Sequence, residues 1–489
     1  MNYLKTSLFI PITVVCFSCF LLSFISVTLS TFLGICLSFW LIMRGRPDGI
    51  LGLFLLYLTR YYFYNINDGS IPDEFREYVI VAGLPINVET VACGFISLRV
   101  FLEKLVRPRT FKSQFPKILL SLWLTAFLPV LIGFYLAYQT RNPNWTRGLR
   151  FLMITGSYFY GYILAKHWPR EKNDILIPIL LPFVIIMFSL MCLGVYWSHH
   201  GFLFMGLSGA FSIYLIYNRP LKYRLLGILV FFLLVEYAIK GSITTIGIIS
   251  LSVLLSYLGE KKQKPLINTS YGSIIKRPNS IFRNRIAKFI GGIAILGILF
   301  FSAGISLLGY HPDYKPSLSH GSYYGTFAER FKAKLLSDRL PFWHAALKQI
   351  ISGPYFVIPS GKPLLLETPG LPDEWVVGAH NTALEILRLD GLFAGTIMLV
   401  ILFLALKNNL LVLTKSTDPV LKSLAAGILG VGIVGMTTGD FPADQTVGFW
   451  IWSLAGLCHC LFLQDSPLSE NRQLRPFQRS QSLVPGLKR

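Results

Sequence analysis

The sequence predicts an all-α polytopic membrane protein with about fourteen transmembrane helices and one large extracytoplasmic loop. Two observations carry this prediction. Hydrophobic residues make up 53% of the 489 residues and charged residues only 14%, and a soluble chain cannot bury so much apolar surface. Long, continuous apolar runs also recur from one end of the chain to the other.

Each run is about 16–23 residues long, which matches the hydrocarbon thickness that a helix must cross. The first run follows Met1 to Lys5 and lacks a clear small-residue cleavage site, so we expect a retained span and not a signal peptide. The expected spans lie near 7–23, 26–43, 49–65, 79–101, 117–138, 148–165, 174–196, 201–217, 225–239, 243–258, 288–309, 391–406, 422–438 and 446–463.

The distribution of charge predicts the topology. The net charge of +21 lies mainly in short loops between spans, which is the pattern of membrane orientation and not of nucleic-acid binding. The basic loops, such as the one with Arg44 and Arg46 and the one from Lys261 to Lys288, all fall on one side. Both termini, including the basic tail at 464–489, are therefore expected in the cytoplasm.

Segment 310–390 is the exception, on the opposite side of the membrane. Eight basic and eight acidic residues balance in it, and proline and glycine punctuate it. We expect so long a loop to be functional. The chain is thus divided into helices 1–11 within 1–309, the loop, helices 12–14 within 391–463, and the tail.

The loop contains a predicted amphipathic helix. Ser337 or Asp338 can cap this helix, and Pro341 is tolerated in its first turn. Arg339 and Trp343 are four residues apart and so face the same way. An apolar stripe along the helix would lie on the membrane surface or dock on the helical bundle. The stripe consists of Leu340, Trp343, Leu347, Ile350 and Ile351.

The loop closes on a polar run from Gly378 to Glu385 that contains His380 and Asn381, and Gly391 follows His380 by eleven residues. Eleven residues are almost three helical turns, so we expect His380 and Gly391 on one face of a helix, with the histidine at its outer mouth. An imidazole where water meets lipid is a candidate for chemistry on an amphiphile.

The pattern Ser-x-Arg-x-x-x-Trp at 337–343, followed roughly 40 residues later by His-Asn-x-x-Leu-x(6)-Gly, resembles the signature of the bacterial O-antigen ligase / O-antigen polymerase family. These are membrane glycosyltransferases of the GT-C type. The resemblance covers about residues 240–460 in order and topology and is specific only at 337–343 and 378–395. The amino-terminal half resembles the family in hydropathy alone.

The resemblance implies a metal-independent, inverting glycosyltransferase of the bacterial inner (plasma) membrane that needs no cofactor. Its site would lie on the periplasmic face, where a glycan moves from undecaprenyl diphosphate to an acceptor hydroxyl. The acceptor is a lipid A–core sugar for a ligase, the partner repeat unit for a polymerase, or a protein Ser or Thr for a related oligosaccharyltransferase. A chain-length regulator and a flippase are further implied partners.

Residue by residue, His380 matches the family's essential histidine, and Arg339 matches the loop arginine that contacts the diphosphate; these are the predicted catalytic residues. Lys240, in Lys240-Gly241-Ser242, stands where the family has an arginine in a Ser-Arg-Gly element. Lys240, Ser337, Trp343 and Asn381 form the predicted set that binds the diphosphate or sugar. The family's glycine-rich element after the loop helix is degraded in this chain.

These residue types suit the implied reaction. Negative charge grows on the diphosphate as the anomeric bond breaks, and a guanidinium can bind its oxygens bidentately while Lys240 adds a point charge. His380 can accept the acceptor's proton or orient its hydroxyl. No metal ion is expected, because fixed cations take its role and no Asp-x-Asp motif lies outside the membrane. All seven cysteines fall in apolar spans, so no disulfide or cysteine-based metal site is expected.

Simpler interpretations stand beside these. His380 could be only a polar residue at a helix mouth, and Trp343 could anchor the loop helix by packing. Arg339 could form an ion pair with Asp338 or Glu329. Lys240 lies four residues after Glu236, which is the spacing of an ion pair on one helix face.

The whole protein also has two alternative interpretations. One is a lipid-linked oligosaccharide flippase or polysaccharide transporter, with polar residues along a central cavity. The other is a catalytically inactive relative that organises a biosynthetic assembly.

Overall fold

The structure is a computed structural model. It describes residues 14, 15, 18, 21, 22, 25–45, 79–81, 84–86, 88–107, 111, 114–139, 145–166, 201–240, 243–261, 339–352, 364–366, 374–376, 379–438 and 448–465. Within these residues the chain is helical except for two small antiparallel hairpins. The helices are α3 (Val27–Arg44), α5 (Val88–Val106), α6 (Gln114–Gln139), α7 (Trp145–Lys166), α9 (Gly201–Asn218), α10 (Leu221–Lys240), α11 (Ile243–Lys261), α14 (Leu340–Ser352), α15 (Thr382–Lys415), α16 (Pro419–Thr438) and α17 (Gly448–Asp465).

The helical class is confirmed, and the fold is consistent with a helical membrane protein. In the described part of the chain, three helices are long and apolar enough to cross a membrane, namely α6, α15 and α16, and α3, α11 and α17 contribute shorter apolar helices. About fourteen spans are therefore not shown. The predicted spans at 49–65, 174–196 and 288–309, with most of 7–23, lie outside the described residues.

The predicted span at 79–101 is wrong in its first third. The backbone from Val79–Val81 (β1) pairs antiparallel with Leu84–Ile86 (β2), and the helix α5 starts only at Val88. A short apolar run rich in valine and isoleucine suits a strand as well as a helix, and hydropathy alone cannot separate the two.

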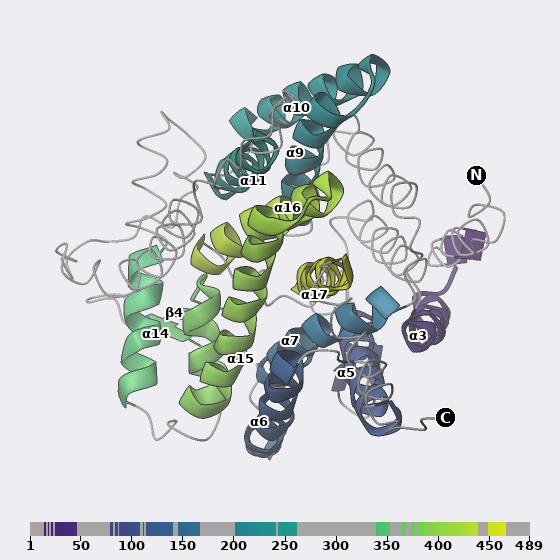
Figure 1. Ribbon diagram of the computed structural model, residues 1–489. Coiled ribbons are helices and arrows are strands. Elements are labelled where there is room, and N and C mark those ends of the chain that lie inside the picture. Colours follow the sequence, from purple (N-terminus) through teal and green to yellow (C-terminus); the bar gives the residue numbers. More distant parts are fainter. Residues whose placement is uncertain are drawn as a thin grey trace, which may run out of the picture.

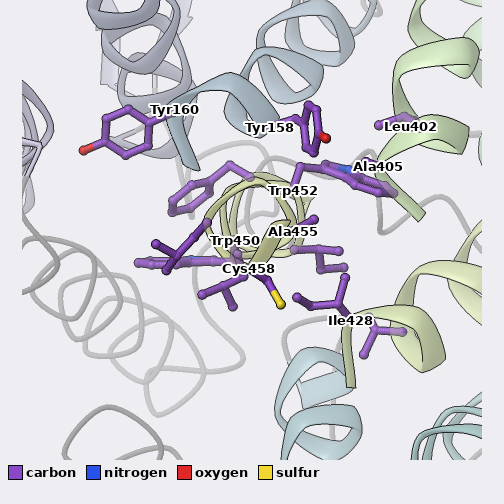
Figure 2. Packing of buried hydrophobic residues seen from close by; sticks show 14 of the residues in the cluster. Tyr158, Tyr160, Leu402, Ala405, Ile428, Trp450, Trp452, Ala455 and Cys458 are labelled. Atoms are coloured by element: carbon purple, nitrogen blue, oxygen red, sulfur yellow. The ribbon is translucent and has the colours of Figure 1, made fainter. Parts of the chain in front are cut away.

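Helix α17 lies at the centre of the bundle. Figure 1 shows it nearly end-on, with α7, α15 and α16 around it, and these three helices all contact it. Figure 2 shows side chains of the core radiating from α17, with Trp452 and Ala455 directed toward Tyr158 of α7 and Ala405 of α15. The two helices α7 and α17 touch through Gly161 and Gly456, where a side chain on either glycine would strike the opposite backbone. Small residues at such crossings let helix backbones approach closely.

The directions of α7 and α15 place the predicted loop site at one end of the bundle. Gly148 in the first turns of α7 lies against Asp390, and the amide of Asn408 farther along α15 donates to the hydroxyl of Tyr158 (2.8 Å). The two helices therefore run in the same direction. His380, just before α15, consequently lies at the end where α7 begins.

Basic residues gather at the opposite end. Near the ends of α5 and α7, the carboxylate of Glu103 pairs with Arg99 (2.7 Å) and with Lys166 (3.4 Å). Near the end of α11, which also packs on the last turns of α15, Lys422 donates to the carbonyl of Gly259 (3.2 Å). This grouping of cations at one end agrees with the charge asymmetry of the sequence.

Apolar side chains cover the outer faces of the peripheral helices. Phe32 on α3, Leu105 on α5, Leu128 on α6 and Phe232 on α10 are all more than half exposed. Exposed apolar surface spread over several helices is unusual for a soluble protein and typical of one that meets lipid.

Candidate functional site

The predicted loop helix exists and docks on the bundle. α14 contacts the start of α15 and the hairpin of Leu364–Leu366 (β3) and Glu374–Val376 (β4), as Figure 1 shows at the edge of the molecule. Of the predicted apolar stripe, Leu340 and Trp343 are buried, whereas Ile351 is 80% exposed. Leu347 and Ile350 also pack against this face, so the predicted stripe docks on the bundle up to Ile350, and only Ile351 at its end does not.

Trp343 lies in a small apolar cluster that joins the loop helix to the start of α15. Its side chain is 3% exposed. The cluster consists of Leu340, Trp343, Ala346, Leu364, Ala379 and Leu384. This burial gives Trp343 the position of a packing anchor.

Asn381 is the N-cap of α15. Its Oδ1 accepts hydrogen bonds from the backbone N–H groups of Ala383 and Leu384, each at 3.1 Å. Its backbone is extended, as an N-cap requires. The carbonyl oxygen of this amide is thereby used in holding the helix start.

His380 precedes the helix and has a left-handed backbone, with φ at 50°. It is half-buried, and its imidazole stacks on the ring of Phe342 from α14, with centroids 5.4 Å apart. A non-glycine residue with positive φ is strained and persists only where its surroundings hold it. The stack brings the two sequence motifs together, since Phe342 lies between Arg339 and Trp343 of the first.

The expectation that His380 and Gly391 share a helical face is wrong. His380 lies outside the helix, and α15 breaks at Gly391, whose φ of 74° and ψ of 168° are non-helical. The part before the break folds against the part after it, because a Cβ on Gly395 would lie 3.2 Å from the carbonyl oxygen of Ile386. Residues eleven positions apart share a face only if the helix is continuous. The chain instead turns a corner at Gly391.

A buried ion pair lies in the short helical segment between His380 and the corner. Arg388 donates from Nη2 to Oε1 of Glu385 (2.6 Å) and from Nε to Oε2 (3.2 Å), and both side chains are fully buried. Oε2 of Glu385 also accepts the backbone N–H of Ala379 (3.0 Å). Arg388 further donates from Nη1 to Gln349 of α14 (3.3 Å).

Asp390 is a fully buried carboxyl at the corner. Neither of its oxygens has a hydrogen-bond partner among the described residues. Gly148 of α7 packs directly on it, and a Cβ at that glycine would lie 2.5 Å from Oδ1. The corner is thus packed tightly against α7.

The remaining predicted site residues are placed less completely. Arg339 is half-buried immediately before α14, three residues from the Phe342 ring that stacks on His380. Lys240 is the last residue of α10, and because α11 begins only three residues later, its backbone lies at the end of the bundle that holds His380. Its side chain and the whole of Ser337 lie outside the described residues.

Sequence reasoning missed Glu385 and Arg388 as a pair, and it missed Phe342. Spacing of three residues in a helix that follows a polar loop is the signal that could have indicated the pair. Nothing in the sequence indicated that Phe342 would reach His380. Within the described residues, no three His, Cys, Asp or Glu side chains gather as a metal-binding group.

A second polar cluster, also missed, lies deep in the bundle. Nδ1 of His459 on α17 lies within hydrogen-bond distance of the hydroxyls of Tyr162 (2.6 Å) and Tyr158 (3.2 Å), and the amide of Asn408 donates to the Tyr158 hydroxyl. All four side chains are buried. Because these residues are up to 301 positions apart, no local pattern could have grouped them.

Comparison with protein-family models, with curated proteins and with solved structures finds no match for this chain. At one end of the bundle the half-buried imidazole of His380, held by an aromatic ring and a strained backbone, lies beside the helix that begins after Arg339. An imidazole and a guanidinium on neighbouring segments can together handle a proton and an anionic leaving group.

Proposed function

We propose that this chain is a glycosyltransferase that moves a glycan from an undecaprenyl-diphosphate carrier to an acceptor hydroxyl, as an O-antigen-type repeat-unit polymerase or ligase. The observation that supports it most is the stack of His380 on Phe342. Two motifs about 40 residues apart, each resembling part of one family signature, pack against each other at one end of the bundle. A chance resemblance in two loop segments would not require them to touch.

In this proposal His380 accepts the proton of the acceptor hydroxyl as its oxygen bonds to the anomeric carbon. The bond from that carbon to the diphosphate oxygen breaks, and the leaving group departs as undecaprenyl diphosphate. Arg339 binds the growing negative charge, and Lys240 adds a second cation from the end of α10. Attack from the face opposite the leaving group inverts the anomeric configuration.

The proposal places the protein in a bacterial inner membrane. The end of the bundle with Glu103, Lys166 and Lys422 would face the cytoplasm together with both termini, following the bias of basic residues. The end with His380 would face the periplasm, where the carrier's diphosphate meets the acceptor. A full set of about fourteen spans, including those outside the described residues, belongs to this topology.

The test is transfer by the purified protein in liposomes that contain an undecaprenyl-diphosphate glycan and candidate acceptors. We expect His380→Ala and Arg339→Ala to lose transfer. His344→Ala and Arg224→Ala are matched controls, because His344 is exposed on α14 and Arg224 lies at the start of α10, at the opposite end of the bundle. Full activity in both site variants refutes the proposal.

Deletion of the gene separates the two forms of the reaction. If the chain is a polymerase, the deletion should shorten the surface glycan to a single repeat unit. If it is a ligase, the deletion should make polymer accumulate on the carrier lipid. Transfer to a protein Ser or Thr in the same liposomes would assign the chain to the oligosaccharyltransferase branch instead.

A flippase is the second candidate, and the broken helix α15 favours it, since transporters often have discontinuous helices. The cluster of Tyr158, Tyr162, Asn408 and His459 weighs against it, because these polar side chains are buried and bond to one another. Movement of a fluorescent lipid-linked oligosaccharide across liposomes without transfer would favour the flippase.

A further inference from the structure

A buried carboxylate accepts a hydrogen bond from the backbone next to His380. Oε2 of Glu385 accepts the N–H of Ala379, the residue immediately before the histidine, at 3.0 Å. The same carboxylate receives two donors from Arg388, at 2.6 and 3.2 Å. Both charged side chains are fully buried.

The guanidinium of Arg388 also bonds to α14, the helix that packs against the histidine ring. Arg388 donates from Nη1 to Oε1 of Gln349 on α14 (3.3 Å). Two turns earlier on the same helix, Phe342 stacks on the His380 ring. One ion pair therefore bonds both to the chain that carries the imidazole and to the helix against which the imidazole rests.

Stability alone does not account for such a pair. Removing two charges from water costs about as much as their attraction returns, so apolar residues of similar size usually serve a fold as well. His380 is moreover kept at a positive φ of 50°, which is a strained conformation that surrounding contacts must enforce. Through the N–H of Ala379, the pair supplies a contact one residue away from that strain.

We propose that Glu385 and Arg388 are positioning residues that set the orientation of the His380 imidazole for proton transfer, and this inference rests on the function proposed above. Neither side chain touches the substrate, because both are buried. Their loss should lower kcat and leave KM nearly unchanged. A shift of about 1 Å at a reacting group can reduce the rate on the order of 100-fold.

The experiment measures kcat and KM for transfer in liposomes by full-length wild type, Glu385→Gln, His380→Ala and the double variant. Glu385→Gln should lower kcat on the order of 100-fold. In the His380→Ala background the same change should have no further effect on the residual rate, because Glu385 acts only through the histidine.

Glu103→Gln is the matched control. Glu103 is equally buried and pairs with Arg99 at 2.7 Å, but it lies at the opposite end of the bundle. It should lower the unfolding temperature about as much as Glu385→Gln and retain wild-type kcat. If both changes reduce kcat equally, the effect is one of general stability and the positioning role is refuted.

A second variant keeps the test valid if Glu385→Gln fails to fold. Replacing the pair together, as Glu385→Leu with Arg388→Met, leaves no unpaired buried charge, so the protein should fold. We expect the same loss of kcat, and a wild-type kcat overturns the inference. Wild-type activity of His380→Ala would instead refute the proposed function itself, whereas an inactive His380→Ala beside a fully active Glu385→Gln refutes only the positioning role.

Discussion

Replacing Gly391 with alanine should destabilise the protein through the corner in α15. The backbone there has φ of 74° and ψ of 168°, a region that is open almost only to glycine. A side chain forced into it costs about 1–3 kcal/mol. That free energy corresponds to a change of about 5- to 150-fold in the ratio of folded to unfolded protein.

The comparison that makes this measurable is Gly94→Ala in α5. A Cβ at Gly94 would meet only the sulfur of Met153, at 3.8 Å, and the residue is helical. Alanine is favoured over glycine by about 1 kcal/mol inside a helix. Gly94→Ala should therefore be neutral or stabilising. Gly391→Ala should lower the unfolding temperature in detergent. It should also lower the transfer rate, because the corner fixes the helical segment that follows His380.

Two outcomes would refute this reasoning. If Gly391→Ala unfolds at the same temperature as Gly94→Ala, the left-handed corner is absent from the folded protein and α15 is continuous. If Gly391→Ala is destabilised but transfers glycan at the wild-type rate, the corner matters for the fold and not for the site.

Three further outcomes follow from single contacts. Asn381→Ala should lower stability by about 0.5–2 kcal/mol through loss of the N-cap, whereas Asn381→Asp, which keeps an acceptor oxygen, should not; thermal unfolding measures both. Tyr162→Phe removes the 2.6 Å hydrogen bond to His459 and should cost about 0.5–1.5 kcal/mol in the same assay without changing transfer. Gly456→Val should prevent stable insertion or lower the unfolding temperature strongly, because its side chain would strike the backbone of Tyr158, and the yield of folded protein in detergent measures this.

Composition and local spacing predicted the class of the fold and one loop helix. Apolar runs indicated most of the described helices, and Pro341 marked the first turn of α14, which begins at Leu340. Periodicity could not anticipate the strands at Val79–Val81, since a short apolar run fits either structure. Three of the described helices are long and apolar enough to cross a membrane, and several of the other predicted spans lie outside the described residues.

The site was predictable only where two motifs could be recognised. His380 and Arg339 were selected on that basis, and their segments do lie together. The corner at Gly391 escaped prediction, because a glycine after a helical stretch can either continue the helix or end it. The link from Arg388 to Gln349 escaped as well, because it joins residues 39 positions apart across two elements.

The contact between Gly161 and Gly456 has a mechanical consequence. Because the main chains of α7 and α17 are in contact at this crossing, no free space separates the two helices there, and a close-packed contact of this kind resists deformation. Their close contact makes the centre of the bundle the least deformable part of the described structure. Under the proposed function, a conformational change that admits the glycan donor is therefore expected around α14 and not between α7 and α17.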